Sequence, residues 1–256
     1  MTLLQVQNCS ISFGGLKALS GLNFSLAAQE LMGIIGPNGA GKTTFFNLVT
    51  GVYDPTEGEL RFEGTLLNPL KPQEINRLGV ARTFQNIRLF PELSVLDNVK
   101  VAFHHRLEYS LWNAVLDDRR FREEEAQVAA EAEGLLTAFH LWELRAERAK
   151  NLSYGDQRRL EMVRALATHP KLLLLDEPAA GMNASEKRDL VELIRRLHRE
   201  LKLAILLIEH DMSVVMNLCP RILVLDYGIP IAEGSPEQIR NDPKVIEAYL
   251  GEKRKH

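Results

Sequence analysis

The chain has 256 residues, of which 45% are hydrophobic and 25% charged, and it carries a formal net charge of −3. This length supports a sizeable core in one large domain or two lobes, and the composition is ordinary for a folded globular protein. The small negative charge gives no reason to expect nucleic acid as the main partner. The two distant cysteines, Cys9 and Cys219, exclude a disulfide framework and a cysteine zinc site and suit a reducing cytosol.

The apolar runs are all short. The longest, at residues 172–175 and 203–208, fall far below the roughly 18 residues of a membrane-spanning helix. The opening residues also turn polar by Gln5, unlike a signal peptide. We therefore expect no membrane span, so that any action at a membrane depends on another subunit.

Two strands are the first predicted elements. Apolar and polar residues alternate over residues 3–13 and again over residues 19–26, with the Gly14-Gly15 turn between them. This pattern predicts an antiparallel edge layer. Phe13, beside the turn, fits either an ordinary core aromatic or a platform on which an adenine base stacks.

A glycine-rich run follows the next predicted strand, residues 31–35, and precedes a short predicted helix, residues 44–50, that Gly51 ends. The run matches G-x-x-x-x-G-K-[ST], the phosphate-binding loop of nucleotide triphosphatases. Its glycines let backbone N–H groups approach a polyphosphate, and the helix adds its unpaired N-terminal amides. In this motif Lys42 reaches the β- and γ-phosphates and Thr43 binds Mg²⁺. The predicted nucleotide-binding residues here are Gly36, Pro37, Asn38, Gly39, Ala40, Gly41, Lys42, Thr43 and Thr44.

The middle of the chain changes character. Residues 72–78 predict a short helix, and residues 79–85 predict a buried strand that ends in the polar Gln85. From about residue 94 to residue 150, glycine and β-branched residues become rare, and apolar residues recur at helical spacing. This predicts a helical lobe inserted into an α/β domain. We interpret the charged run at residues 122–130 as a solvated helix face.

The α/β pattern returns in the last third of the chain. Residues 171–177 predict a buried strand that ends in Asp176 and Glu177, and residues 204–210 predict another that ends in His210. Four apolar residues followed by an aspartate match the Walker B element, which orients Mg²⁺. Glu177 is then placed to polarise an attacking water as a general base. A helix at residues 190–201, a hairpin at 221–232 and short helices at 236–250 complete the predicted elements.

The segment Leu152-Ser153-Tyr154-Gly155-Asp156 lies about twenty residues before the Walker B element. It resembles the L-S-G-G-Q signature loop of ATP-binding cassette (ABC) proteins, which occupies the same place in that family. Ser153 can cap the following helix, so that its N-terminal amides face an anion. In the family this anion is the γ-phosphate held by the opposite subunit.

This resemblance covers nearly the whole chain and implies a role for each matching residue. It implies that Phe13 stacks on adenine, that Gln85 senses Mg²⁺ and water, and that His210 contacts the γ-phosphate. The implied cofactors are ATP and Mg²⁺. The implied catalytic residues are Glu177, His210 and Gln85, the metal-binding residues are Thr43, Gln85 and Asp176, and Ser153 and Gly155 join the nucleotide-binding set.

The resemblance also implies the fold. It is an α/β fold with a P-loop NTPase (RecA-like) core, an antiparallel β layer and an inserted α-helical lobe, as in ABC ATPases. The expected arrangement is a single ABC ATPase domain at residues 1–256. Its core and β layer take about residues 1–93 and 165–256, and its helical lobe takes about residues 94–164.

Three positions depart from the family pattern. Tyr154 stands where the signature usually has glycine, Asp156 where it usually has glutamine, and Asn183 replaces the aspartate of the D-loop. Asn183 fits an N-cap instead, with Glu186 three residues later as in a capping box. These changes bear on the strength and symmetry of hydrolysis and leave the predicted fold as it is.

One subgroup of the family matches best. The combination of Phe13-Gly14-Gly15 with residues 81–90, 154–161 and 176–183 is similar to the larger ATP-binding subunit of bacterial branched-chain amino acid importers. This implies a peripheral ATPase subunit on the cytoplasmic face of the inner (plasma) membrane that energises an importer. The implied partners are a second ATP-binding subunit in a homo- or heterodimer, transmembrane permease subunits and, indirectly, a periplasmic binding protein, with no nucleic acid.

Three alternatives stay open at this point. The first is an ABC ATPase for another cargo, such as urea, short amides or an exported lipid. The second is a cassette that works in DNA repair or translation, although such proteins usually carry two cassettes or a long coiled-coil insert. The third is a phosphate-loop kinase or GTPase, in which the signature loop and His210 have no role.

Overall fold

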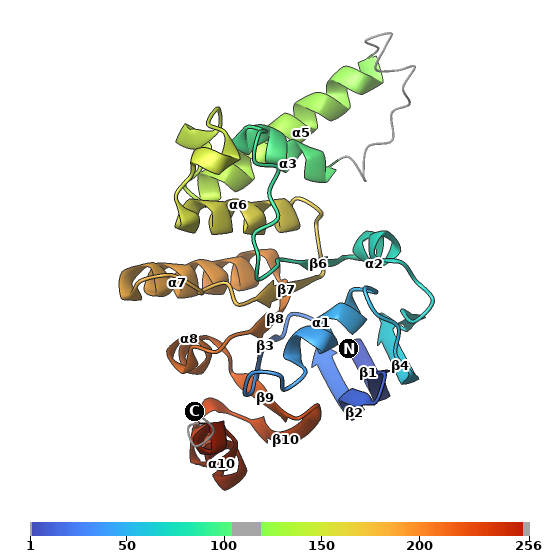
Figure 1. Cartoon of the computed structure of the whole chain (residues 1–256). Coiled ribbons are helices and arrows are strands. Elements are labelled where there is room, and N and C mark those ends of the chain that lie inside the picture. The colour runs from blue at the N-terminus through green and yellow to red at the C-terminus, as the bar shows by residue number, and fades with distance from the viewer. Residues whose placement is uncertain (1, 104–118, 253–256) are drawn as a thin grey trace. The chain divides into compact units, whose positions relative to one another are not determined.

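The computed structural model describes residues 2–103 and 119–252 (Figure 1). The chain divides into two compact units, the first formed by Met1–Gln85 with Lys171–His256 and the second by Asn86–Pro170. The second unit contains the predicted helical lobe, residues 94–164, of which residues 104–118 lie outside the described residues.

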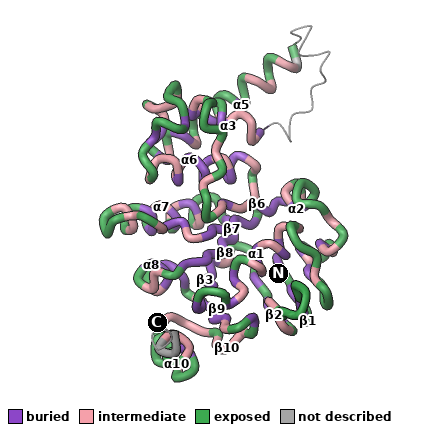
Figure 2. Tube along the Cα trace, viewed as in Figure 1, coloured by how far each residue is buried: buried purple, intermediate pink, exposed green. Residues whose placement is uncertain are grey.

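The main sheet of the first unit explains where its polar loops meet. Its strand order is β10-β9-β3-β8-β7-β6, in which β10 alone pairs antiparallel with its neighbour among the described strands. Figure 2 shows buried residues concentrated along the central strands, and every residue of β3, β7 and β8 is buried. Continuous apolar runs such as Leu172–Leu175 form these strands because both sheet faces are covered. The strands are β3 (Leu31–Ile35), β6 (Val80–Arg82), β7 (Leu172–Asp176), β8 (Ala204–Ile208), β9 (Arg221–Asp226) and β10 (Ile229–Gly234).

A second, antiparallel sheet confirms the predicted edge layer. Its order is β2-β1-β4-β5, and Val6 pairs with Phe24 on one side and with Leu60 on the other. All three side chains are buried, as the period-two alternation of the sequence requires. The strands are β1 (Thr2–Phe13), β2 (Leu16–Ala27), β4 (Glu57–Phe62) and β5 (Thr65–Leu66).

Helix α1 (Lys42–Val49) joins the two sheets in one core. Its fully buried Phe45 and Phe46 belong to the same apolar cluster as β1, β2 and β4 on one side and β3, β7 and β8 on the other. Phe24 of β2 meets Phe45 edge to face, with ring centroids 5.4 Å apart. The core thus fixes α1 at the end of β3, and it thereby fixes the loop between them.

The remaining helices of the first unit follow the predicted pattern except for the helix Met212–Leu218, which the sequence pattern did not indicate. In α7, Leu190, Ile194 and Leu197 are buried on one face, and Asn183 caps the helix by accepting hydrogen bonds from the backbone N–H groups of Ser185 and Glu186. The predicted capping box is therefore confirmed. These helices are α2 (Pro72–Leu78), α7 (Ala184–Leu201), α8 (Met212–Leu218), α9 (Pro236–Asn241) and α10 (Pro243–Glu252).

The described part of the second unit is helical. Its core contains Val99, Phe103, Leu136, Leu160 and Val163. The charged run at residues 122–130 lies in α5, and within this run every residue except Val128 is exposed or half-buried, as expected of a solvated face. The elements are α3 (Val95–Phe103), α5 (Arg119–Ala138), the 3-10 turns η2 (Trp142–Leu144) and η3 (Ala149–Asn151), and α6 (Tyr154–Leu166).

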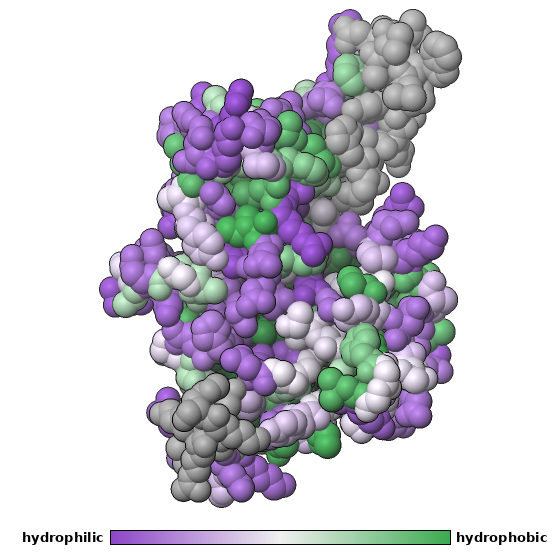
Figure 3. Space-filling view, in the orientation of Figure 1, coloured by the Kyte–Doolittle hydropathy of each residue, from purple (hydrophilic) through white to green (hydrophobic). Residues whose placement is uncertain are grey.

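The polarity of the surface is that expected from a composition ordinary for a globular protein. The face shown in Figure 3 is mostly hydrophilic, with apolar side chains in separate patches. Within residues 2–103 and 119–252, no helix is both long and apolar enough to cross a membrane.

Candidate active site

The loop Gly36–Thr43 runs from β3 to α1 and is held tightly against its neighbours. A Cβ atom at Gly36 would lie 2.0 Å from the carbonyl oxygen of Leu225, and one at Gly41 would lie 2.7 Å from the carbonyl oxygen of Ala18. Gly41 also has a φ of 98°, a left-handed conformation that a side chain disfavours. Both positions therefore require glycine. The loop is fastened to the hairpin of β9 and β10, because Gly228 donates its N–H to the carbonyl of Ala40 at 3.1 Å.

A cavity of about 440 Å³ opens above this loop within the first unit. It gathers residues that are far apart in the sequence, because the loop, Phe13, Gln85 and Glu177 all line it. A Cβ at Gly39 would meet nothing within 4 Å, so the loop backbone faces open space there. Exposed backbone and a helix N-terminus with no acidic residue in its first turn fit a polyphosphate. The full lining is Phe13, Leu16, Lys17, Ala18, Asn38, Gly39, Ala40, Gly41, Lys42, Thr43, Thr44, Gln85, Glu177 and Tyr227.

Lys42 supplies a positive charge at the floor of the cavity. It is 7% exposed, and its Nζ donates hydrogen bonds to the carbonyl oxygens of Gly36 at 2.6 Å and of Pro37 at 2.8 Å. These carbonyls fold the side chain back over its own loop. The ammonium is thus placed among the backbone groups that would surround a phosphate.

Aromatic side chains lie at another edge of the cavity. Phe13 is 44% exposed, so it is not the buried core residue that one interpretation expected. Its ring centroid lies 5.0 Å from that of Tyr53, at an interplanar angle of 68°. This edge-to-face contact orients the Phe13 ring. The contact of Tyr53 was not predicted, although an aromatic residue within a turn cluster was a signal for it.

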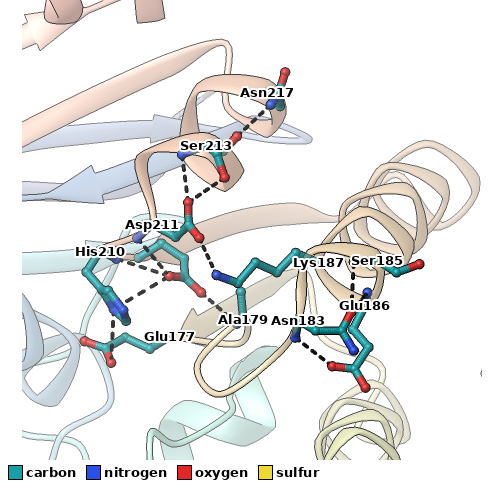
Figure 4. A network of polar contacts seen from close by, with 11 residues as sticks. Glu177, Ala179, Asn183, Ser185, Glu186, Lys187, His210, Asp211, Ser213 and Asn217 are labelled. Atoms are coloured by element: carbon teal, nitrogen blue, oxygen red, sulfur yellow. Dashed lines mark hydrogen bonds and ion pairs between the residues drawn. The ribbon is translucent and has the colours of Figure 1, made fainter.

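The three predicted catalytic side chains come together beyond the carboxyl ends of β6, β7 and β8, which Gln85, Glu177 and His210 follow in turn. Gln85 donates from Nε2 to Oε2 of Glu177 at 3.0 Å. Nδ1 of His210 lies 3.6 Å from the same oxygen (Figure 4). Glu177 is 18% exposed at its side chain and His210 is 60% exposed. The carboxylate is therefore accessible to water and flanked by two polar side chains, an arrangement suited to a general base.

Asp176, the predicted Walker B aspartate, is buried beneath this group. Its Oδ2 accepts a hydrogen bond from Nη2 of Arg82 at 2.7 Å, and the side chains are 2% and 5% exposed. Arg82 also donates to Oδ1 of Asn47 at 2.6 Å and lies over the rings of Phe46 and Phe84. Of the three predicted metal-binding residues, Thr43 and Gln85 line the cavity, whereas Asp176 is not among its lining residues. The role of Arg82 was missed, although a charged residue inside a predicted buried strand was a signal for it.

Replacing Arg82 with methionine is expected to lower the free energy of unfolding by about 3–5 kcal/mol, because Asp176 would keep a buried charge with no partner. Urea denaturation followed by circular dichroism measures this loss. The double variant Arg82→Met/Asp176→Asn is expected to lose less than the sum of the single changes. Additive losses would show that the two side chains do not depend on each other.

In the second unit, the segment 152–156 begins helix α6 as predicted. Oγ of Ser153 accepts a hydrogen bond from the backbone N–H of Asp156 at 3.2 Å, which confirms Ser153 as an N-cap. Tyr154 accepts at its hydroxyl from Nη2 of Arg158 at 2.8 Å, and its ring lies 5.3 Å from that guanidinium. The side chain at the position where the family usually has glycine is therefore tied to a buried arginine, which in turn lies 3.4 Å from Glu161.

Comparison with known proteins identifies relatives along the whole chain. The family profile described as "ABC transporter" matches residues 19–180, and the one described as "Branched-chain amino acid ATP-binding cassette transporter" matches residues 230–254. The chain is 48% identical over 250 residues to the high-affinity branched-chain amino acid transport ATP-binding protein LivG of Escherichia coli K12, covering 98% of each chain. It is 44% identical to the corresponding protein BraF of Pseudomonas aeruginosa, again covering 98% of each.

A solved structure agrees with these matches. The crystal structure of the ADP conformation of an ATP-binding cassette of an ABC transporter superimposes with a TM-score of 0.85 at 32% identity, covering 98% of this chain and 99% of that one. The predicted fold class is thus confirmed.

Proposed function

This chain belongs to the ABC transporter family of ATP-binding cassettes, and from that premise we propose that it hydrolyses ATP to energise an importer of branched-chain amino acids. The observation that carries the proposal is the cavity in which the phosphate loop, Gln85 and Glu177 meet. Full-length identity to LivG and BraF, and the second family match at residues 230–254, support the cargo.

The predicted site residues, in the cavity and next to it, each have a distinct task in this proposal. The backbone amides at the start of α1 and the ammonium of Lys42 bind the phosphates, and Phe13 stacks on the base. Glu177 takes a proton from the attacking water, while His210 contacts the γ-phosphate. Thr43, Gln85 and Asp176 would hold Mg²⁺, directly or through water, and when bound it neutralises charge on the β- and γ-phosphates.

Two subunits are needed to complete each site. In the proposed assembly, Ser153 and Gly155 of one subunit enclose the γ-phosphate bound by the other, so both units of the chain act as one ATPase domain. The N-terminal amides of α6, which Ser153 caps, are suited to that anion. The partner is either a second copy or a related ATP-binding subunit.

Contact with permease subunits would hold the protein at the cytoplasmic face of the inner membrane. The loop before α3 supports this placement, because Phe90 is 44% and Leu93 36% exposed there. Buried Asn98 fixes the loop by accepting from the N–H of Phe90 and donating to its carbonyl. A fixed loop with exposed apolar side chains suits a helix from a membrane subunit. A periplasmic binding protein would deliver the amino acid to those subunits.

The dimer is tested by the concentration dependence of hydrolysis. We expect ATP turnover per subunit to rise with protein concentration, because an isolated subunit cannot complete the γ-phosphate cage. Ser153→Arg is expected to lower turnover at every concentration while leaving the binding of a fluorescent ATP analogue unchanged. Turnover that is independent of concentration in both proteins would contradict the shared site.

The cargo is tested on the assembled transporter. Co-expressed with its permease subunits in proteoliposomes, the protein is expected to drive ATP-dependent uptake of leucine, isoleucine and valine. Calorimetry with these amino acids on the purified chain is expected to show no binding, because the cargo does not contact this subunit. Uptake of urea or short amides instead, or export of a lipid, would change the cargo that we propose. The proposed hydrolysis of ATP by this chain would stand.

A further inference from the structure

Glu209 directly follows β8 and is fully buried, with 0% of its surface exposed. A carboxylate without water is costly unless hydrogen bonds replace the lost solvation. Here Oε1 accepts from the backbone N–H of Ala179 at 2.7 Å, and Oε2 accepts from those of His210 at 3.1 Å and Asp211 at 3.4 Å. Burial raises the pKa of Glu209, and these hydrogen bonds oppose the shift. Its buried oxygens thus serve as acceptors for backbone donors.

The donors belong to two different loops. Ala179 lies in the loop that follows β7, two residues after Glu177, and His210 and Asp211 lie in the loop that follows β8. A further contact joins the loop that follows β8 to helix α7, because Nζ of Lys187 lies 2.5 Å from Oδ2 of Asp211 (Figure 4). Hydrogen bonds from Lys187 and Ser213 lower the pKa of Asp211 and keep this pair charged. The loop that follows β8 is therefore held both to the loop of Glu177, through Glu209, and to the helix that comes after that loop, through Lys187.

Glu177 has an unusual backbone conformation that needs such support. Its φ is 49°, in the left-handed region, which costs a residue with a Cβ about 1–2 kcal/mol. The conformation is stabilised at its own N–H, which donates to the carbonyl of Ile208 at 2.8 Å, and at its carbonyl, which accepts from Ala180 at 3.2 Å. Glu209 holds Ala179, inside that turn, to the end of β8.

We propose that Glu209 is a positioning residue for ATP hydrolysis, whose carboxylate ties the loop of Glu177 to the loop of His210 and keeps Glu177 in its left-handed conformation. From that conformation the Glu177 side chain reaches Nε2 of Gln85 and Nδ1 of His210. Glu209 is not among the residues that line the cavity, so its effect passes through Glu177. This inference rests on the proposed function of Glu177 as the base.

Glu209→Gln tests the proposal with little change in volume. The three backbone N–H groups that now donate to two carboxylate oxygens would have a single amide oxygen as their acceptor. The amide NH₂ group, itself a donor, would face at least one of these N–H groups. We expect kcat to fall about 10-fold, because small displacements of a reacting group are costly, while the Kd for a fluorescent ATP analogue stays within about twofold. Glu192→Gln is the matched control, since Glu192 is 71% exposed at its side chain on α7 and should change neither value. Unchanged kcat in folded Glu209→Gln would overturn the proposal.

Two further measurements separate this proposal from the function on which it rests. Hydrogen exchange in Glu209→Gln is expected to accelerate at the amides of Ala179, His210 and Asp211, which donate to the carboxylate in the unchanged protein. In a Glu177→Gln background, Glu209→Gln should lower kcat no further, because it acts through Glu177. A further fall in kcat in the double variant would contradict the proposal that Glu209 acts through Glu177. Normal hydrolysis by Glu177→Gln alone would overturn the role of Glu177 as the base, but it would leave the hydrogen bonds between Glu209 and the two loops unchallenged.

A second variant, Glu209→Asp, keeps the charge but shortens the side chain by one methylene. It is expected to fold and to show the same loss of kcat with unchanged nucleotide binding. Loss of folding in both Glu209→Gln and Glu209→Asp, measured by circular dichroism, would give Glu209 a purely structural role and contradict the proposal.

Discussion

Glu177→Gln is expected to reduce steady-state ATP turnover by about 10²-fold or more and to leave ATP binding intact. The amide keeps the size of the side chain and can still contact Gln85 and His210, which lie 3.0 Å and 3.6 Å from Oε2. It cannot accept a proton from water. Phosphate release measures turnover, and titration with a fluorescent ATP analogue measures binding.

The same variant should accumulate the ATP-bound dimer. If hydrolysis opens the dimer, a chain that binds ATP without cleaving it remains closed, and size-exclusion chromatography with ATP detects the larger species. Glu192→Gln serves again as the matched control, with normal turnover and no trapped dimer. Normal hydrolysis by folded Glu177→Gln would remove Glu177 from the role of base.

Lys42→Ala is expected to weaken the binding of ATP itself, by about 10²-fold or more. The ammonium is the buried cation at the floor of the cavity, and each charge-assisted hydrogen bond to a phosphate is worth about 1.5–3 kcal/mol. The substitution also leaves the carbonyls of Gly36 and Pro37 without the donor that now orients the loop. Isothermal titration calorimetry with ATP measures the loss.

A second lysine provides the control for charge alone. Lys17 lines the same cavity but is exposed, so Lys17→Ala removes one positive charge from the edge of the site and is expected to change the Kd less than about threefold. Equal losses in the two variants would mean that the net charge of the cavity governs affinity. Unchanged affinity in Lys42→Ala would contradict the placement of the phosphates on this loop.

The elements that depend on local interactions were predictable from the amino-acid sequence alone. The motif Gly36–Thr43 predicted its loop because only glycine tolerates its close backbone contacts and positive φ angles. The caps at Ser153 and Asn183 were likewise predictable, since each involves residues two or three positions apart. Uninterrupted apolar runs predicted the buried strands β7 and β8.

The pairing of distant side chains around the site was not predictable in this way, because it depends on the folded arrangement of the strands. The contact of Arg82 with Asp176 and that of Glu209 with Ala179 join segments 94 and 30 residues apart. No local pattern encodes such pairs, because they depend on the parallel order of β6, β7 and β8, which brings the carboxyl ends of these strands to one edge of the sheet. The same packing holds Glu177 in a conformation that its own sequence disfavours, since its hydrogen bonds to Ile208 at the end of β8 and to Ala180 outweigh a local cost of about 1–2 kcal/mol.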